Sequence, residues 1–254
     1  SNTWDYPLQG FGRQRFNHTA TLTPRGDIRM IGGRDCPAAA YNVSCASFET
    51  RSLTAIIPRL TAWTLGESPT MSAARGKHSV TTLPDGTLLI AGGTNGPNIL
   101  RTSEIYNPLA NTMTPSGTMK DVRDLHTATL LPNGRVLVAG GSSNNATSTG
   151  AINGSEIFYK ETGLWLPTAS LMVSSRANHT ATLLADGNGL VVGGLANGVY
   201  LNSCEIFYST SGVWKATTPL PVARSLHSAT LLQDGRVLVV GGNSAAGVLG
   251  DSYA

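Results

Sequence analysis

The chain of 254 residues is long enough for one large domain or for an array of repeats. Charged residues make up 13% of it, and the net charge of +3 comes from scattered Arg and Lys side chains. It contains no basic run of the kind that binds nucleic acid, and no apolar stretch near the roughly 20 residues of a membrane span. We therefore expect no nucleic-acid partner and no membrane span.

Five segments share one pattern, in which a His is followed 14 residues later by a Gly-Gly pair. The segments begin at His18, His78, His126, His179 and His227. A period of about 50 residues is typical of solenoids and propellers, whose units bury their faces against their neighbours.

Each unit opens with two segments that read as a β-hairpin. The first, such as 127–131, alternates small or polar residues with apolar ones, and the second, such as 136–139, is continuously apolar. An Asp-Gly or Asn-Gly turn separates them, for example Asp85-Gly86, and predicts a two-residue type I′ turn. The continuous apolar pattern predicts that the second strand is buried on both faces.

Two further strands follow at variable distance. Third segments are 103–106, 155–159 and 203–208, and nine residues after each Glu comes Met113, Trp165 or Trp214, which opens a fourth segment. The same spacing counted back from Trp63 reaches Thr54, in the degenerate third segment of the first unit. Four antiparallel strands per unit predict the blades of a β-propeller and an all-β fold class.

The diglycine hairpin, the Glu-Ile-Tyr segment and the Trp at fixed spacing together resemble the kelch repeat, in the His-containing subtype of galactose-oxidase-like propellers. The resemblance covers essentially the whole chain and implies a kelch-type β-propeller with five recognisable four-stranded repeats. We expect a single propeller over 1–254. Its units are 11–66, 67–116, 117–168, 169–217 and 218–254, with 1–10 as a fourth-strand segment.

The sequence leaves the closure of the propeller open, because it begins and ends inside a repeat. The N-terminal strand with Trp4 could complete the last blade of a closed five-bladed ring. Alternatively, the five repeats belong to a ring of six or seven blades. A third possibility is that the N-terminal strand completes a neighbouring molecule, which gives a homo-oligomer or a filament.

The repeated polar residues allow a structural and a functional interpretation. We expect each His to be buried and hydrogen-bonded within its blade. An Arg stands three residues before every His, and a ring of guanidinium groups on one face could bind an acidic ligand. These arginines are Arg15, Arg75, Arg123, Arg176 and Arg224. The structural alternative is that each Arg pairs with a backbone carbonyl or with an acid of the next blade.

Other repeated residues are expected to be structural. Glu104, Glu156 and Glu205 should anchor a neighbouring-blade Arg or turn amides. Trp4, Trp63, Trp165 and Trp214 should pack between blades. Cys204, which lies in a strand, should be a buried free thiol.

Cysteines and glycosylation motifs point to an extracellular location. Cys36 and Cys45 lie nine residues apart in one insertion, and we expect them to form a disulfide. Asn-x-Ser/Thr motifs make five asparagines candidates for glycosylation: Asn17, Asn42, Asn145, Asn153 and Asn178.

The sequence favours a non-enzymatic module with no catalytic residue, metal ligand or cofactor. It should bind a protein or glycan through one propeller face, or assemble with copies of itself. The resemblance also implies an alternative, the propeller portion of a secreted copper-radical oxidase. That chemistry requires a Cys–Tyr cross-link, a second Tyr and two His ligands, a set that we do not find. A further alternative is an intracellular kelch adaptor, which would have no glycans and reduced cysteines.

Overall fold

The computed structural model describes residues 14–23, 28–36, 47–48, 52–56, 69–144 and 150–254, and all of its regular elements are β-strands. Within these ranges, no helix is long and apolar enough to cross a membrane. The strands recur in the order that the repeat predicts, so we describe them by their place in the unit.

The first strands directly follow each repeated His, and they are β2 (Thr19–Leu22), β7 (Ser79–Thr82), β13 (Thr127–Leu130), β17 (Thr180–Leu183) and β23 (Ser228–Leu231). The second strands are β3 (Ile28–Ile31), β8 (Leu88–Ala91), β14 (Val136–Ala139), β18 (Gly189–Val192) and β24 (Val237–Val240). The third strands are β6 (Ser52–Ile56), β11 (Thr102–Asn107), β15 (Ser155–Tyr159), β21 (Cys204–Tyr208) and β27 (Ser252–Tyr253). Fourth strands are described for the three middle units, as β12 (Thr112–Thr118), β16 (Leu164–Pro167) and β22 (Val213–Thr217).

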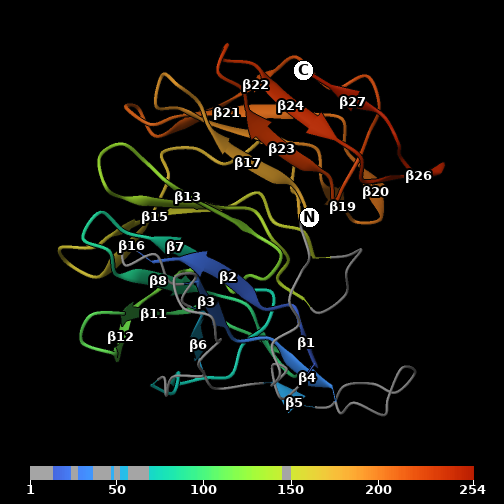
Figure 1. Ribbon diagram of the computed structural model, residues 1–254. Coiled ribbons are helices and arrows are strands. Elements are labelled where there is room, and N and C mark those ends of the chain that lie inside the picture. Colours follow the sequence, from blue (N-terminus) through green and yellow to red (C-terminus); the bar gives the residue numbers. More distant parts are fainter. Residues whose placement is uncertain (1–13, 24–27, 37–46, 49–51, 57–68, 145–149) are drawn as a thin grey trace, which may run out of the picture.

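The strands of each unit pair in an antiparallel sheet, which we call a blade. Blades 2, 3 and 4 each have four strands, in the orders β12-β11-β8-β7, β13-β14-β15-β16 and β17-β18-β21-β22. Within the described residues, blade 1 has the order β2-β3-β6 and blade 5 the order β23-β24-β27. The predicted four-stranded units are therefore confirmed for the three middle blades, and Figure 1 shows the blades following one another along the chain.

Short strands after the Gly-Gly pairs of blades 2, 4 and 5 project from one end of the blades. β9 (Thr94–Asn95) pairs with β10 (Asn98–Ile99), β19 (Leu195–Ala196) with β20 (Val199–Tyr200), and β25 (Asn243–Ser244) with β26 (Gly247–Val248). In the first unit this place is taken by a small sheet of β1 (Gln14–Phe16), β4 (Arg34–Cys36) and β5 (Ser47–Phe48). Figure 1 shows β1, β4, β5, β19, β20 and β26 on one side of the molecule, which we call the hairpin face.

The turns between first and second strands correct one expectation. In the turn at Asp85-Gly86, the Gly86 N–H donates to the Leu83 carbonyl, and the Leu83 N–H donates to the Thr87 carbonyl. Gly86 has a φ of 81°, whereas Asp85 is not among the described residues with positive φ. This is a three-residue loop with glycine in the left-handed position, not a two-residue type I′ turn, and Asp-Gly suits both. The same hydrogen bonds recur at Gly134, Gly187 and Gly235.

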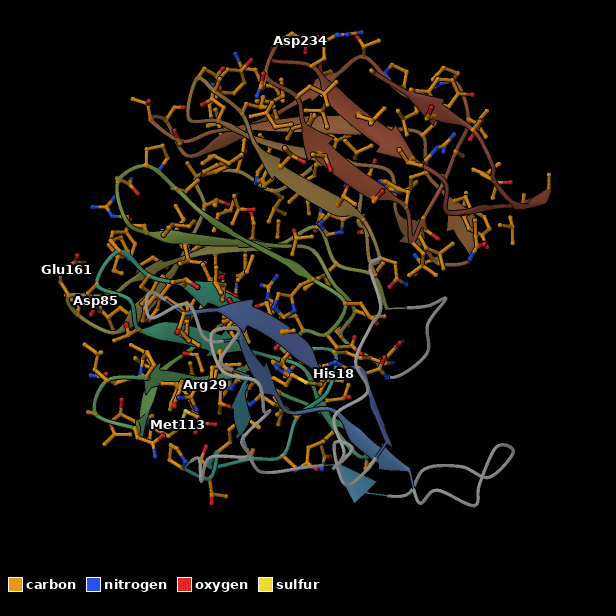
Figure 2. The ribbon with its side chains drawn as sticks, viewed as in Figure 1. His18, Arg29, Asp85, Met113, Glu161 and Asp234 are labelled. Carbon is orange, nitrogen blue, oxygen red and sulfur yellow. The ribbon has the colours of Figure 1, made fainter. Side chains whose placement is uncertain are left out.

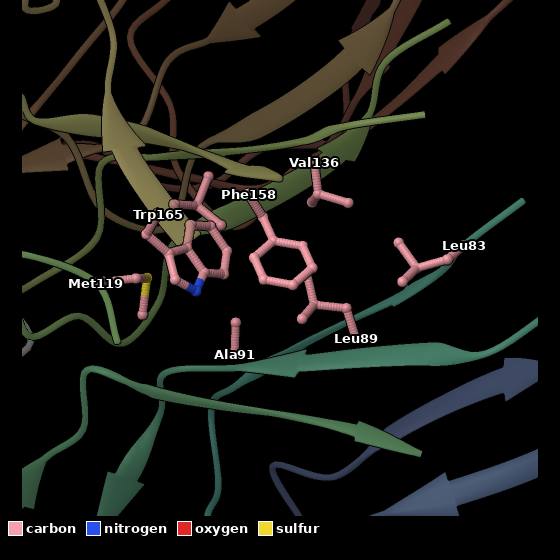
Figure 3. Close-up of a cluster of buried hydrophobic side chains, with 8 residues drawn as sticks. Leu83, Leu89, Ala91, Met119, Val136, Phe158 and Trp165 are labelled. Atoms are coloured by element: carbon pink, nitrogen blue, oxygen red, sulfur yellow. The ribbon is translucent and has the colours of Figure 1, made fainter. Parts of the chain in front are cut away.

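Alternating side chains of each second strand form the core between consecutive blades. Leu89 and Ala91 of blade 2 pack against Val136 and Phe158 of blade 3, as Figure 3 shows. Trp165 and Met119 also belong to this cluster. All residues of β8 and β14 are buried, as the continuous apolar pattern predicts. A fully buried side chain of this size stabilises the fold by about 1.5 to 3 kcal/mol, so every junction between blades is substantial.

The blades make contact in chain order. First strands contact each other from β2 to β7, β7 to β13, β13 to β17 and β17 to β23. Among the described strands, no contact of similar extent joins β23 to β2, and no closed ring is seen. The choice between a ring of five blades and one of six or seven is therefore the same as after the sequence analysis.

Candidate functional site

The repeated arginines occupy the interior of their blades. The Arg75, Arg123, Arg176 and Arg224 side chains are each 0% exposed. In each, Nη1 donates to the carbonyl of the first glycine of the Gly-Gly pair in the same blade, at distances from 2.6 to 2.9 Å. These four guanidinium groups have no exposed surface for a ligand, and the Arg15 side chain lies outside the described residues.

A buried Glu neutralises three of these guanidinium groups. Glu104 lies 2.7 Å from Arg75, Glu156 2.7 Å from Arg123, and Glu205 2.6 Å from Arg176. The second oxygen of each Glu accepts a backbone N–H, for example that of Ser72 at 2.8 Å. Burial lowers the pKa of Arg75 and Arg123, and the paired Glu opposes this shift. The arrangement favours the structural interpretation of the arginines, with one correction: each Arg and its Glu belong to the same blade, not to neighbouring ones.

The fifth unit forms the same pair from a different residue. Tyr253 stands opposite Val239, the place that Glu205 takes opposite Val191 in the fourth unit. Asp251, two residues earlier, supplies the carboxylate and lies 2.9 Å from Arg224. The Arg224 guanidinium also lies 4.9 Å from the centre of the Tyr253 ring.

The histidines join consecutive blades. This corrects the expectation that each His is hydrogen-bonded within its own blade. Each Nε2 shares a hydrogen bond with the hydroxyl that follows the His of the preceding blade. His78 bonds to Thr19 at 3.1 Å, His126 to Ser79 at 2.8 Å, His179 to Thr127 at 2.9 Å and His227 to Thr180 at 2.9 Å.

Burial keeps these imidazole rings neutral. It lowers the pKa of His78 and His126 to about 3 and that of His227 to about 4, and the neighbouring Arg contributes to each shift. Burial and Arg176 likewise lower the pKa of His179 well below its usual range. Within the part of the chain that the structure describes, no group of three or more His, Cys, Asp or Glu residues could hold a metal ion.

Trp165, Trp214 and Cys204 lie where the repeat predicts. Trp165 and Trp214 are buried and donate from Nε1 to Ser103 and Ser155 of the preceding blade, at 3.0 and 2.8 Å. Their role between blades is confirmed, whereas Trp4 and Trp63 lie outside the described residues. Cys204 is a buried free thiol, as expected, and burial raises its pKa.

The motifs that indicate an extracellular location are only partly described. Cys45, Asn42 and Asn145 lie outside the described residues, as does the Cys36 side chain. Asn17 is exposed, and Asn178 is half-buried. The Asn153 amide donates to the Met172 carbonyl at 3.1 Å.

The hairpin face brings together residues that the repeat does not explain. Both connections of unusual length, 34–48 and 142–154, follow a Gly-Gly pair, so both start at this face. The exposed apolar side chains of Val199 and Val248 lie on its hairpins, 62% and 87% exposed. Leu226 is 63% exposed and follows Ser225, which bridges to Asn243 at the start of β25.

The opposite end of the blades carries short polar turns. Lys160 and Asp85 form an ion pair there, between turns of blades 3 and 2. Figure 2 shows Asp85 and Glu161 close together on the side away from β19 and β26. We call this end the turn face, and in the part of the chain that the structure describes its connections show no comparable variation in length.

A buried charge under the hairpin face was missed in the sequence. Asp124 is 1% exposed, and its carboxylate lies 3.6 Å from Lys77 Nζ of the preceding blade. Burial raises the pKa of Asp124 to about 6, although Lys77 opposes the shift. The signal was present in the repeat: two residues before the His, the other units have Phe16, Gly76, Ala177 and Ser225, so Asp124 is the only acid at this position.

Comparisons with known proteins support the fold. No family model matches the chain, and no curated protein matches it. Many solved structures do match. One of them, titled "Structure of YjhT", is a kelch-like propeller that aligns with a TM-score of 0.72 at 13% identity. The match covers 98% of this chain and 84% of that chain. The chain therefore has an all-β, propeller-like fold.

Proposed function

We propose that the chain is an extracellular, non-enzymatic kelch-type propeller that binds a protein or a glycan through its hairpin face. The observation that carries this proposal is that both length-variable connections start at the same face, beside the exposed side chains of Val199, Val248 and Leu226. Loops of variable length on a rigid scaffold commonly carry binding function.

The repeated polar residues support the proposal by their placement. The four described guanidinium groups hold the strands of their own blade together and the His rings join consecutive blades, so neither is free to bind a ligand or to transfer protons. A role in recognition is left to the hairpin face, because its residues differ from unit to unit.

The binding test compares the two faces of the same chain. The full chain would be measured by biolayer interferometry against an immobilised panel of oligosaccharides and against fractionated secreted proteins. We expect the double variant Val199→Asp/Val248→Asp to lose at least about tenfold in affinity for any ligand found, because both side chains are exposed on the hairpins of this face.

The matched control is Leu109→Asp/Leu164→Asp on the turn face, whose side chains are 64% and 53% exposed. It should bind like the wild type. Equal loss in both double variants, or loss in the control alone, would remove the hairpin face as the binding site.

The extracellular assignment has its own test. We expect chain from its native source to lose mass on enzymatic removal of N-glycans, and its Cys36 and Cys45 to resist alkylation before reduction. A chain without glycans whose two cysteines are both alkylated unreduced would favour the intracellular adaptor instead.

A further inference from the structure

The residues that directly precede the repeated histidines are hydrogen-bonded to one another from blade to blade, and we call them the rim. Their backbones are left-handed, with φ between 52° and 56°: Asn17, Lys77, Leu125, Asn178 and Leu226. Each N–H donates to the carbonyl of the rim residue in the preceding blade. The distances are 3.1 Å from Lys77, 3.4 Å from Leu125, 3.2 Å from Asn178 and 3.1 Å from Leu226. The rim bond between blades 2 and 3 is therefore the longest of the four.

An ion pair crosses the rim at this same junction. Lys77 Nζ of blade 2 lies 3.6 Å from the Asp124 carboxylate of blade 3. The backbone of Asp124 also exchanges two hydrogen bonds with Ser142, at 3.0 and 2.8 Å. Ser142 begins the long connection 142–154 of the hairpin face. Asp124 therefore links the rim to the root of that connection.

The Asp124 carboxylate lacks the hydrogen-bond donors that stabilise other buried acids of the chain. Its side chain is 1% exposed, and within the described residues neither of its oxygens accepts a hydrogen bond. Glu156, in contrast, accepts from Arg123 and from the Lys120 N–H, each at 2.7 Å. An ionised carboxylate at the Asp124 site is costly, because one lysine at 3.6 Å replaces its hydration incompletely. A protonated carboxyl group carries no such cost.

The other charged and titratable residues beside the rim have partners of their own. The arginines are paired with acids of their own blades: Arg75, Arg123 and Arg176. The histidines are neutral rings that bond to the preceding blade: His78, His126 and His179. Asp121 is 43% exposed and lies 3.8 Å from Arg123. Within the described residues, the charge of Asp124 is therefore balanced by Lys77 alone.

We propose that Asp124 is a proton-controlled clamp on the hairpin face. A proton on its carboxyl group holds the rim closed between blades 2 and 3. Loss of that proton favours an open rim, in which the carboxylate reaches water. Because Ser142 is bonded to Asp124, the same proton steadies the root of the 142–154 connection. This inference concerns the conformation of the face and does not depend on the proposed binding function.

The closed rim binds the proton more tightly than the open one. Burial raises the pKa of Asp124 to about 6 in the closed rim, although Lys77 opposes the shift. In the open rim the pKa returns toward the ordinary 3.8, because the carboxylate is hydrated. The closed form therefore gains as pH falls through 6. Between pH 7 and pH 5, the ratio of closed to open rim should rise by about tenfold.

Native-state hydrogen exchange, followed by NMR on the full chain, tests the clamp. The protection factor of the Leu125 N–H is compared with that of the Asn178 N–H, which makes the same rim bond at a junction without an acid. Both junctions contain a buried neutral His, so the ratio of the two protection factors removes the effect of the histidines. We expect this ratio to rise about tenfold from pH 7 to pH 5.

Three variants identify the group that is responsible. Asp124→Asn should abolish the rise, because the amide is uncharged at both pH values. The matched control Asp121→Asn removes an acid three residues earlier and should keep the rise. Lys77→Met should lower the protection of Leu125 at pH 7 and enlarge the rise, because the ionised carboxylate loses its neighbouring cation.

A carbon-13 NMR titration of the Asp124 carboxyl group in the wild type gives a second measurement that needs no variant. We expect a midpoint of about 6. A midpoint near 3.8 would overturn the proposal, as would a protection ratio that stays constant or falls between pH 7 and pH 5. A rise that survives in Asp124→Asn would assign the pH dependence to another group.

Discussion

The junction between blades 2 and 3 and the hairpin face differ in how closely their residues follow the repeat. At the junction, Arg123, His126 and Glu156 recur in the repeat. Their side chains form hydrogen bonds and ion pairs with other groups in the protein interior. On the hairpin face, the exposed residues and the long connections differ from unit to unit. Recurrence in this chain therefore identifies residues that hold the scaffold, and departure from the repeat identifies candidates for function.

The largest effect should come from removing one partner of a buried ion pair. We expect Arg123→Met to lower the free energy of unfolding by about 3 to 5 kcal/mol, because Glu156 would stay buried without its counter-charge. Denaturant unfolding followed by tryptophan fluorescence measures the loss. The double variant Arg123→Met/Glu156→Leu should lose less than the single variant. A single variant as stable as the wild type would contradict the structural role of the arginines.

The second-largest effect should come from acid, which weakens the junctions between blades. The His78 and His126 pKa values are about 3 in the folded chain, below the ordinary 6.5, so the unfolded chain binds protons more readily between these values. The stabilisation is complete above pH 6.5 and falls as pH drops, by about 2 kcal/mol for each of these histidines at pH 5.

Asp124 opposes this trend, since its folded pKa of about 6 lies above the ordinary 3.8. Its protonation stabilises the folded chain as pH falls through 6, and Asp124→Asn should therefore steepen the net loss in acid. Unfolding midpoints between pH 7 and pH 5 measure both trends. A wild type equally stable at both pH values would show that the histidines are not held neutral by burial.

Glycine substitutions separate a covered face from an open one. We expect Gly92→Asn to cost about 1 to 3 kcal/mol, because the new side chain collides with the Arg123 carbonyl and the His126 ring. Gly241→Asn has the same φ of 65° and should cost less than about 1 kcal/mol, because within the described residues a Cβ there would meet only the Leu249 carbonyl, at 3.6 Å. Thermal unfolding of the two variants side by side gives the difference, and equal losses would mean that both faces are covered.

The smallest effect on stability should come from the exposed valines of the hairpin face. Val199→Asp/Val248→Asp should change the free energy of unfolding by no more than about 0.5 kcal/mol per site, because both side chains are exposed. The same calorimetric scans that measure the glycine variants would measure this one. A large loss of stability would show that the hairpins support the scaffold and would weaken their assignment to binding.

The sequence predicted the strands of the middle units well but not the partners of their side chains. Periodic patterns place strands such as β14 and β15 directly, because apolar alternation and turn residues are local properties. A repeat does not show whether Glu156 pairs with the Arg of its own unit or of the next, since each unit offers both. The His126 bond to Ser79 was missed for the same reason.

Other features could not be predicted from the repeat pattern alone. Asp-Gly suits more than one hairpin turn, so the three-residue loop at Gly86 could not be told from a type I′ turn. Asp251 pairs with Arg224 in the unit where Tyr253 stands in place of the repeat Glu, a pairing that spacing alone does not reveal. Asp124 was recognisable as an unusual residue, but its burial and its contact with Lys77 required the three-dimensional arrangement.

The most direct test of the account is to map which arginines of the native chain react with phenylglyoxal, using peptide mass spectrometry. Exposed residues such as Arg101 and Arg236 should react, whereas Arg75, Arg123, Arg176 and Arg224 should stay unmodified until the chain is unfolded. Reaction of these four arginines in the folded chain, at rates like those of Arg101, would contradict their burial. It would instead restore an exposed ring of guanidinium groups as the binding site.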